Sequence, residues 1–369
     1  MSSYLMMMRS RIIGSREALG KFQFVTISGR VEFEDVGKVV KIAHYYSRAV
    51  KAGINLALRG VPLNDAVKEL YRIIPYAFYA ETAYKQALAL IKNGGNKIEI
   101  RRRWIACKGS KADRGNRGIK FHVLEDHVEV KVKDPWGRWI VGRAYFGRKY
   151  LPLLRELEEL AGKGEEGYGA VISFKEKPMI HLQIPLWLYL KHFSVKKPIG
   201  YGLIAGFDLN SDRLNVVVID KEGRIITFKT WWYTEVVSPG FPREKARALR
   251  LNALSQALNF LSRIGVDYVA FEDLFLVKGR RRFTKSRSGN RKISRFAKRQ
   301  LLAHGVIKAL RLGFNVILVN PKGTTDSEEH EKAMREKGFD RHMASAYLIA
   351  LRGLEEIKNN GQLRKNTTD

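Results

Sequence analysis

The sequence predicts an α/β and β-barrel multidomain protein: an N-terminal β-barrel with a helical insert, then a C-terminal α/β domain on a mixed five-stranded sheet. Many short alternating strands separated by turn residues fill the first half, which is typical of a barrel. The second half shows the order βββ-α-β-α-β-α in its apolar periodicity. Residues 194–200 (SVKKPIG) lie between the halves and have the composition of a linker.

In the first half we expect short strands, one short helix and an insert of two long helices. The N-terminal segment is interpreted as a leader and the C-terminal segment as a polar tail. The predicted division is a leader at 1–20, a barrel at 21–34 and 97–193, a helical insert at 35–96, a linker at 194–200, an α/β domain at 201–357 with a basic insertion at 277–299, and a tail at 358–369. Strands are expected over 22–33, 98–107, 119–124, 127–132, 136–146, 169–174 and 179–185, and helices over 36–58, 64–91 and 151–160.

In the second half, five apolar runs predict strands and three segments of helical spacing predict helices. Right-handed crossover connections would place the first and fourth strands side by side and parallel. The strands are expected over 203–207, 214–219, 225–233, 266–271 and 315–320, and the helices over 243–264, 294–312 and from Asp340 onward.

The composition points to a polyanionic partner. The chain has 369 residues, 45% of them hydrophobic, which is enough for two or three domains with a substantial core. Lys and Arg number 67 against 37 Asp and Glu, so the net charge is +30. Because no stretch approaches a membrane-spanning length, nucleic acid is favoured over a membrane. The single cysteine, Cys107, excludes an internal disulfide, suits a cytoplasmic (nucleoid-associated) protein and is expected in the core.

Three acids stand at the ends of predicted elements in the second half. Asp208 ends the first strand, where a buried strand would prefer Val or Ile, Glu272 ends the fourth, and Asp340 opens the last helix. Two unit charges about 4 Å apart repel by about 4 kcal/mol at an effective dielectric near 20, so convergence needs a counter-charge. Mg²⁺ takes oxygen ligands, and two such ions would activate water and stabilise the leaving oxygen of a phosphodiester.

The segments GFDLN, FEDL and DRHMASAYLIALRG resemble the three acidic motifs of the RuvC-type nuclease domain, which has the RNase H fold. More closely, they resemble TnpB, the transposon-encoded RNA-guided nuclease related to type V CRISPR effectors. The resemblance implies that Asp208, Glu272 and Asp340 are catalytic, metal-binding acids with two Mg²⁺ ions as cofactors. It also implies a wedge-like barrel and a recognition-like insert, with guide RNA and double-stranded DNA as partners.

The chain departs from TnpB proteins in one respect. They usually carry a four-cysteine zinc ribbon between the fifth strand and the last acidic motif, whereas residues 322–339 contain no cysteine and are predicted to form a short capped helix. No zinc is therefore expected.

Each acid also has a structural interpretation. Asp208 could cap the following turn, Glu272 could be a solvated strand end with Asp273 as the alternative, and Asp340 could be a helix N-cap. Their joint occurrence at the three positions where an RNase H fold has its acids favours catalysis. Further candidates for the phosphate or for proton transfer are Lys322, Thr324, His330 and His342, each with a turn or surface role as its alternative.

The basic side chains are predicted to contact nucleic acid as a group, although each alone could belong to a solvated surface. Residues 278–299 hold eleven Lys or Arg and no acid, directly after Glu272. The predicted contacts are Arg101, Arg102, Arg103, Lys108, Lys111, Arg114, Arg117, Lys278, Arg280, Arg281, Arg282, Lys285, Arg287, Arg291, Lys292, Arg295, Lys298 and Arg299.

The leading hypothesis is an RNA-guided DNA endonuclease of the TnpB type. A second is an RNA-guided DNA-binding protein, a repressor or targeting factor, without effective cleavage. A third is a junction-resolving nuclease that needs no RNA.

Overall fold

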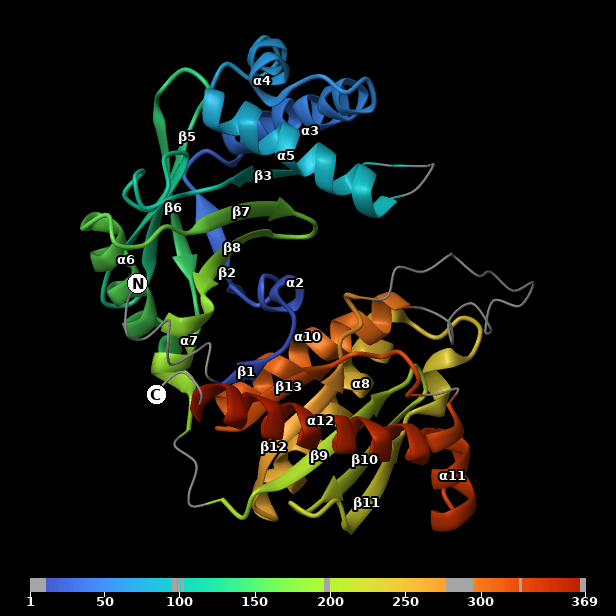
Figure 1. The fold of residues 1–369 in the computed structure, drawn as a ribbon. Coiled ribbons are helices and arrows are strands. Elements are labelled where there is room, and N and C mark those ends of the chain that lie inside the picture. The colour runs from blue at the N-terminus through green and yellow to red at the C-terminus, as the bar shows by residue number, and fades with distance from the viewer. Residues whose placement is uncertain are drawn as a thin grey trace. The chain divides into compact units, whose positions relative to one another are not determined.

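The computed structural model describes residues 11–94, 98, 100, 103–195, 200–276, 295–324 and 327–365. The chain divides into two compact units, each with its own sheet (Figure 1). One unit is Phe24–Tyr189, and the other combines Met1–Gln23 with Leu190–Asp369.

The C-terminal unit is built on a mixed sheet with the strand order β1-β13-β12-β9-β10-β11. The predicted parallel pairing of the first and fourth strands is confirmed, because β9 pairs with β12 in parallel and with β10 in antiparallel orientation. Part of the predicted leader forms the short strand β1, which pairs with β13 as a sixth strand. The elements are β1 (Ile12–Ile13), α2 (Arg16–Leu19), β9 (Leu203–Leu209), β10 (Arg213–Ile219), β11 (Ile225–Trp232), a 3-10 turn (Thr234–Val237), α8 (Arg243–Arg263), β12 (Val266–Glu272), α10 (Arg295–Arg311), β13 (Asn315–Val319), α11 (Glu328–Lys337) and α12 (Arg341–Lys365).

Helices cover both faces of this sheet: α12 lies on one face, and α8 and α10 lie on the other (Figure 1). Strand side chains alternate between the faces. Phe207 and Phe271, with ring centroids 4.8 Å apart, face the α8–α10 side. Gly206 faces α12, where an added Cβ would lie 2.2 Å from the Ala346 carbonyl oxygen. The absence of a side chain at Gly206 therefore lets α12 lie directly on β9.

The interval without cysteines before α12 forms the predicted capped helix, α11. The Ser327 side chain accepts a hydrogen bond from the His330 backbone amide at the N-terminus of α11. Gly338 ends the helix with φ +65°, a left-handed conformation that glycine adopts without strain.

The N-terminal unit holds a seven-stranded sheet in the order β3-β7-β8-β2-β6-β5-β4. The predicted barrel is not shown, because in the described part of the chain no pairing joins the edge strands β3 and β4. Side chains from neighbouring helices occupy positions beside these edges: Glu158 accepts from the Val123 amide at 3.0 Å, and Gln86 accepts from the Trp104 indole at 2.9 Å. Glu158 thus satisfies one backbone donor of the β4 edge.

The helical insert differs from the prediction in one place. The helix expected over 64–91 is divided at Pro75, which has no amide hydrogen to continue a helix.

Cys107 is buried as predicted, and burial raises the pKa of its thiol to about 12. The elements are β2 (Phe24–Phe33), α3 (Val36–Leu58), α4 (Leu63–Tyr71), α5 (Ala77–Gly94), β3 (Arg103–Cys107), β4 (Ile119–Val123), β5 (Val128–Lys133), β6 (Trp139–Tyr145), a 3-10 turn (Arg148–Tyr150), α6 (Leu151–Gly162), β7 (Gly169–Phe174), β8 (Pro178–Pro185) and α7 (Leu186–Phe193), which reaches the unit boundary.

Substituting Gly206 tests the close approach of α12. We expect Gly206→Ala to lower the free energy of unfolding by about 1–3 kcal/mol, because the new methyl group meets helix backbone that cannot yield cheaply. Denaturant unfolding measures the loss. Gly162→Ala is the control, since an added Cβ there meets nothing within 4 Å. Equal stability of Gly206→Ala and the unmodified chain would contradict the packing described.

Candidate active site

Asp208 and Glu272 leave the sheet at neighbouring points. Phe207 of β9 is the register partner of Phe271 of β12, and the two acids are the next residues of these parallel strands. By alternation both side chains lie on the face covered by α12. Asp208 is 7% exposed and Glu272 is partly buried.

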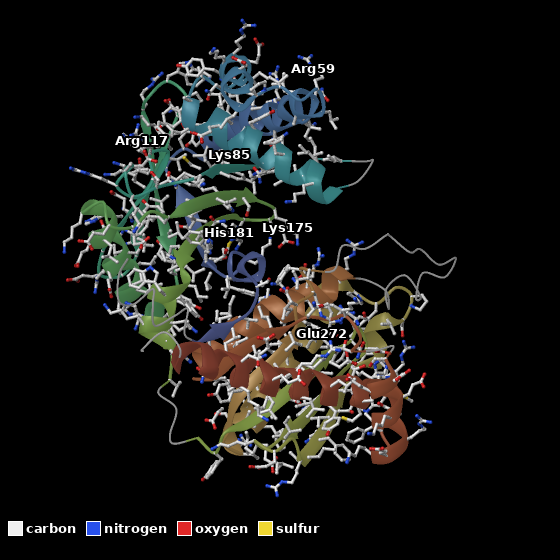
Figure 2. The ribbon with its side chains drawn as sticks, viewed as in Figure 1. Arg59, Lys85, Arg117, Lys175, His181 and Glu272 are labelled. Carbon is white, nitrogen blue, oxygen red and sulfur yellow. The ribbon has the colours of Figure 1, made fainter. Side chains whose placement is uncertain are left out.

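The surroundings of Glu272 disfavour its charge. Burial raises the pKa of Glu272, and the negative charge of Asp208 raises it further. The Thr324 hydroxyl, which donates to Glu272 Oε1, and the cations Lys298 and Arg352 oppose this rise without cancelling it. Glu272, which is labelled in Figure 2, therefore lies within the electrostatic reach of Asp208.

Polar side chains from three elements surround Asp208. Asn210 Nδ2 donates to Asp208 Oδ2 at 2.5 Å, and His342 Nδ1 of α12 lies 2.9 Å from the same oxygen. Lys298 Nζ of α10 donates to Asn210 Oδ1 at 3.0 Å. The sequence analysis did not single out Asn210 for this role, although the GFDLN motif contains it. Lys298, expected to contact nucleic acid, here lies beside the acids.

The turn after β9 is held in place by the surrounding fold. The buried Tyr233 hydroxyl lies 2.9 Å from the Asn210 carbonyl oxygen and 2.7 Å from that of Arg213. Arg250 Nε of α8 donates to the Ser211 carbonyl oxygen at 3.0 Å. These contacts fix the backbone that carries Asp208 and Asn210.

Asp340 is placed differently from the other two acids. It is exposed, and its Oδ1 accepts a hydrogen bond from the Met343 amide at 2.7 Å, which is the N-cap arrangement of α12. Within the described residues, no group of three or more His, Cys, Asp or Glu side chains is arranged to hold a metal ion. The structure therefore brings Asp208 and Glu272 together, whereas Asp340 caps the helix whose first turn reaches them through His342.

Other candidates from the sequence have structural partners. Asp273 is fully buried and accepts hydrogen bonds from the Ser15 hydroxyl and the Phe275 amide. His330 Nε2 lies 2.8 Å from the Arg341 carbonyl oxygen, so this buried ring links α11 to the start of α12. Lys322 is an exposed turn residue.

An orphaned buried oxygen supports the fit of a cation near Asp208. Asn215 of β10 lies directly opposite Asp208 in the antiparallel register, so the two side chains share a face. Asn215 Nδ2 donates to Thr230 at 2.8 Å, whereas its Oδ1 has no hydrogen-bond partner among the residues described. Two carboxylates and this carboxamide oxygen are the hard donors that Mg²⁺ prefers.

The structure describes the side chains of seven of the eighteen predicted nucleic-acid contacts. Those on β3 and the following loop are exposed, and Lys111 and Arg117 also pair with acids, at 3.4 Å and 2.6 Å. Figure 2 labels Arg117 on the N-terminal unit. Arg299 donates to the Leu274 carbonyl oxygen at 3.2 Å. The exposed residues are Arg103, Lys108, Lys111, Arg114 and Arg117. The side chain of Arg295 is not described, and Arg101, Arg102, Lys278, Arg280, Arg281, Arg282, Lys285, Arg287, Arg291 and Lys292 lie outside the described residues.

The chain is similar to a family profile, to a relative in sequence and to solved structures. The family profile of the SSO2105 N-terminal domain matches residues 24–194. The Saccharolobus solfataricus protein SSO2105, described as uncharacterized, is 64% identical over 94% of this chain and 97% of its own length. None of the described helices has the length and hydropathy of a membrane span.

Among solved structures, Thermus thermophilus RuvC in complex with a Holliday junction substrate is 20% identical over 43% of this chain and 96% of its own, with a TM-score of 0.31. The Cas12f1–sgRNA–target DNA complex is 11% identical over 85% of this chain and 80% of its own, with a TM-score of 0.41. Both TM-scores are below 0.5.

The raised pKa of Glu272 predicts a pH-dependent cost in stability. The folded chain holds the proton more tightly than the unfolded chain, so stability falls as the pH rises from the usual glutamic acid pKa through the folded value. The cost then persists at neutral pH. We expect Glu272→Gln to melt at a higher temperature than the unmodified chain near neutral pH, with the difference vanishing in acid.

Thermal unfolding over a pH series, with a chelator present, measures this difference. Glu235→Gln is the control, because Glu235 is an exposed acid of the same unit. A Glu272→Gln variant that melts below the unmodified chain near neutral pH would refute the burial cost.

Proposed function

The chain belongs to the SSO2105 family, and we propose that its acidic site is that of a metal-dependent nuclease, which hydrolyses phosphodiester bonds. The observation that carries the proposal is the placement of Asp208 and Glu272 at adjacent ends of the parallel strands β9 and β12. Burial and the neighbouring Asp208 charge raise the pKa of Glu272, so its ionised form is costly unless the site serves a cation.

The residues divide into ligands and positioning groups. Asp208 and Glu272, with Asn215 Oδ1 on the same face, would hold Mg²⁺, which supplies an activated water and neutralises charge on the phosphate. Asn210 and His342 orient the Asp208 carboxylate, and the Thr324 hydroxyl orients that of Glu272. Lys298, fixed by Asn210, provides a cation for a phosphate oxygen.

In its finer form, the proposal is an RNA-guided DNA endonuclease of the TnpB type. Three ordered motifs, GFDLN, FEDL and DRHMASAYLIALRG, support it, with Asp340 as the third acid. A net charge of +30 suits a protein that holds both a guide RNA and a double-stranded DNA target.

A second candidate is an RNA-guided DNA-binding protein without effective cleavage. The observation that favours it is the position of Asp340, which is exposed and engaged as the N-cap of α12. A site with two carboxylates in place would bind a cation but hydrolyse a phosphodiester less effectively.

Removing the Asp208 carboxylate separates these candidates. Sequencing the RNA that co-purifies with the full chain identifies the guide, and a matched DNA duplex then serves as substrate with Mg²⁺. We expect Asp208→Ala to slow cleavage at least about 100-fold, the loss of several kcal/mol of charge stabilisation. Asp220→Asn is the control, since Asn preserves a turn in which Asp220 accepts backbone amides. Undiminished cleavage by Asp208→Ala would refute the site, and guide-dependent binding without any cleavage by the unmodified chain would favour the second candidate.

Substituting Asp340 by Asn distinguishes a metal ligand from a helix cap. Asn retains the N-cap hydrogen bond but removes the negative charge. If Asp340 is the third catalytic acid, we expect cleavage by Asp340→Asn to fall at least about 10-fold with an unchanged melting temperature. Unchanged cleavage together with unchanged stability would assign Asp340 to capping alone.

A further inference from the structure

A cavity of about 420 Å³ lies within the N-terminal unit, between the start of α3 and the turn that joins β5 to β6. Its lining combines aromatic rings and cations, and none of these residues is among the predicted nucleic-acid contacts. The residues that matter here are Lys38, Lys41, Tyr45, Trp136, Arg138 and Trp139.

Asp134 builds the turn that forms one wall of the cavity. Its buried Oδ1 accepts hydrogen bonds from the Trp136 amide at 2.9 Å and the Arg138 amide at 2.8 Å. Gly137 takes φ +95°, which a glycine adopts without strain. The indole of Trp136 is therefore presented on a defined backbone rather than on an irregular loop.

Two aromatic rings of this wall are exposed. Trp136 is 59% exposed and Trp139 is 38% exposed. The Tyr45 ring of α3 meets Trp136 edge to face, with centroids 6.3 Å apart. Exposed indoles beside a cavity mark a ligand site rather than core packing, and flat π-faces are stacking surfaces for nucleobases.

The charge around the cavity is positive. Lys38 and Lys41 are exposed on α3, and the ammonium groups of Lys120 and Lys133 lie 5.8 Å and 5.3 Å from the Trp139 ring centroid. The Asp134 carboxylate is engaged by the turn amides and by Arg138 Nε at 3.6 Å, so it does not cancel this field. Lys38 also pairs with Asp35 at 2.8 Å. An apolar ligand would make no use of Lys41, and a bare phosphate would make no use of the indoles.

We propose that this cavity binds one unstacked nucleotide of a single-stranded polynucleotide, with the base against Trp136 and its phosphates near Lys38 and Lys41. The cavity volume falls within the range of about 300–1,000 Å³ typical of small-ligand sites. A duplex cannot use the site, because its bases are paired and stacked. The proposal goes beyond the nuclease site, since it requires neither a metal ion nor Asp208.

Fluorescence anisotropy of the full chain with labelled oligonucleotides, in the presence of a chelator, tests the proposal. The probes are an oligouridylate RNA, an oligothymidylate DNA, an abasic DNA strand and a DNA duplex. We expect Trp136→Ala to weaken binding of the base-bearing strand by about 5- to 150-fold, the worth of one base–aromatic stack. Binding of the duplex and of the abasic strand should not change. The RNA and DNA arms show which sugar the site accepts.

Two further variants separate stacking from general electrostatics. Trp136→Phe keeps a stacking face and should retain most of the single-strand affinity. Tyr71→Ala is the matched control, because Tyr71 is a 48% exposed aromatic of the same unit outside the cavity, and it should bind like the unmodified chain.

Two results would overturn the proposal, given unchanged melting temperatures. One is single-strand binding by Trp136→Ala that equals the unmodified chain for both RNA and DNA. The other is an equal loss for base-bearing, abasic and duplex probes, which would mean a general basic surface. Because the assay involves no cleavage, its outcome is separate from that of the nuclease proposal.

Discussion

The acidic site depends on the direct contact of α12 with β9 and β12. Gly206 has no side chain, so the backbone of α12 around Ala346 and Ala350 lies against the strand. Gly353 reaches Ala270 of β12 in the same way, because an added Cβ would lie 2.9 Å from the Ala270 Cβ. The helix thus lies along the sheet and delivers its first turn, with His342, to Asp208.

The charges at this site are balanced by residues from outside the sheet. Burial and the charge of Asp208 both raise the pKa of Glu272. Lys298 from α10 and Arg352 from α12 offset part of that rise. In the proposed nuclease this arrangement would accept a divalent cation with little reorganisation, because the neighbours that orient the carboxylates are already hydrogen-bonded. Structural acids such as Asp273 are instead fully satisfied by backbone and hydroxyl donors.

The N-terminal unit contributes a different kind of surface. Buried tyrosines form hydrogen bonds within its core. The Tyr79 hydroxyl, for example, lies within hydrogen-bond distance of the carbonyl oxygens of Gly118 and Lys133. Trp136 and Trp139 are left at the surface among lysines. The unit therefore separates aromatic residues that stabilise the fold from aromatic residues that are available to a ligand.

The sequence by itself determined five strands of the C-terminal sheet, the parallel pairing of β9 with β12 and the strand ends at which Asp208 and Glu272 lie, but it did not indicate β1. Hydrophobic periodicity and the handedness of crossover connections are local or nearly local rules, so they can be applied along one chain. Pro75 was a sequence signal for the break between α4 and α5. The apolar residues on both sides keep helical spacing, so a single helix was predicted instead.

Only the tertiary structure decided whether the first sheet closes, which polar groups surround Asp208 and what Asp340 contacts. Whether the edge strands β3 and β4 pair depends on long-range packing, and alternation within a strand does not encode that. Asn210 meets Lys298 across 88 residues of sequence. Such contacts depend on side-chain rotamers and on the packing of whole helices, which a pattern of residue types does not specify.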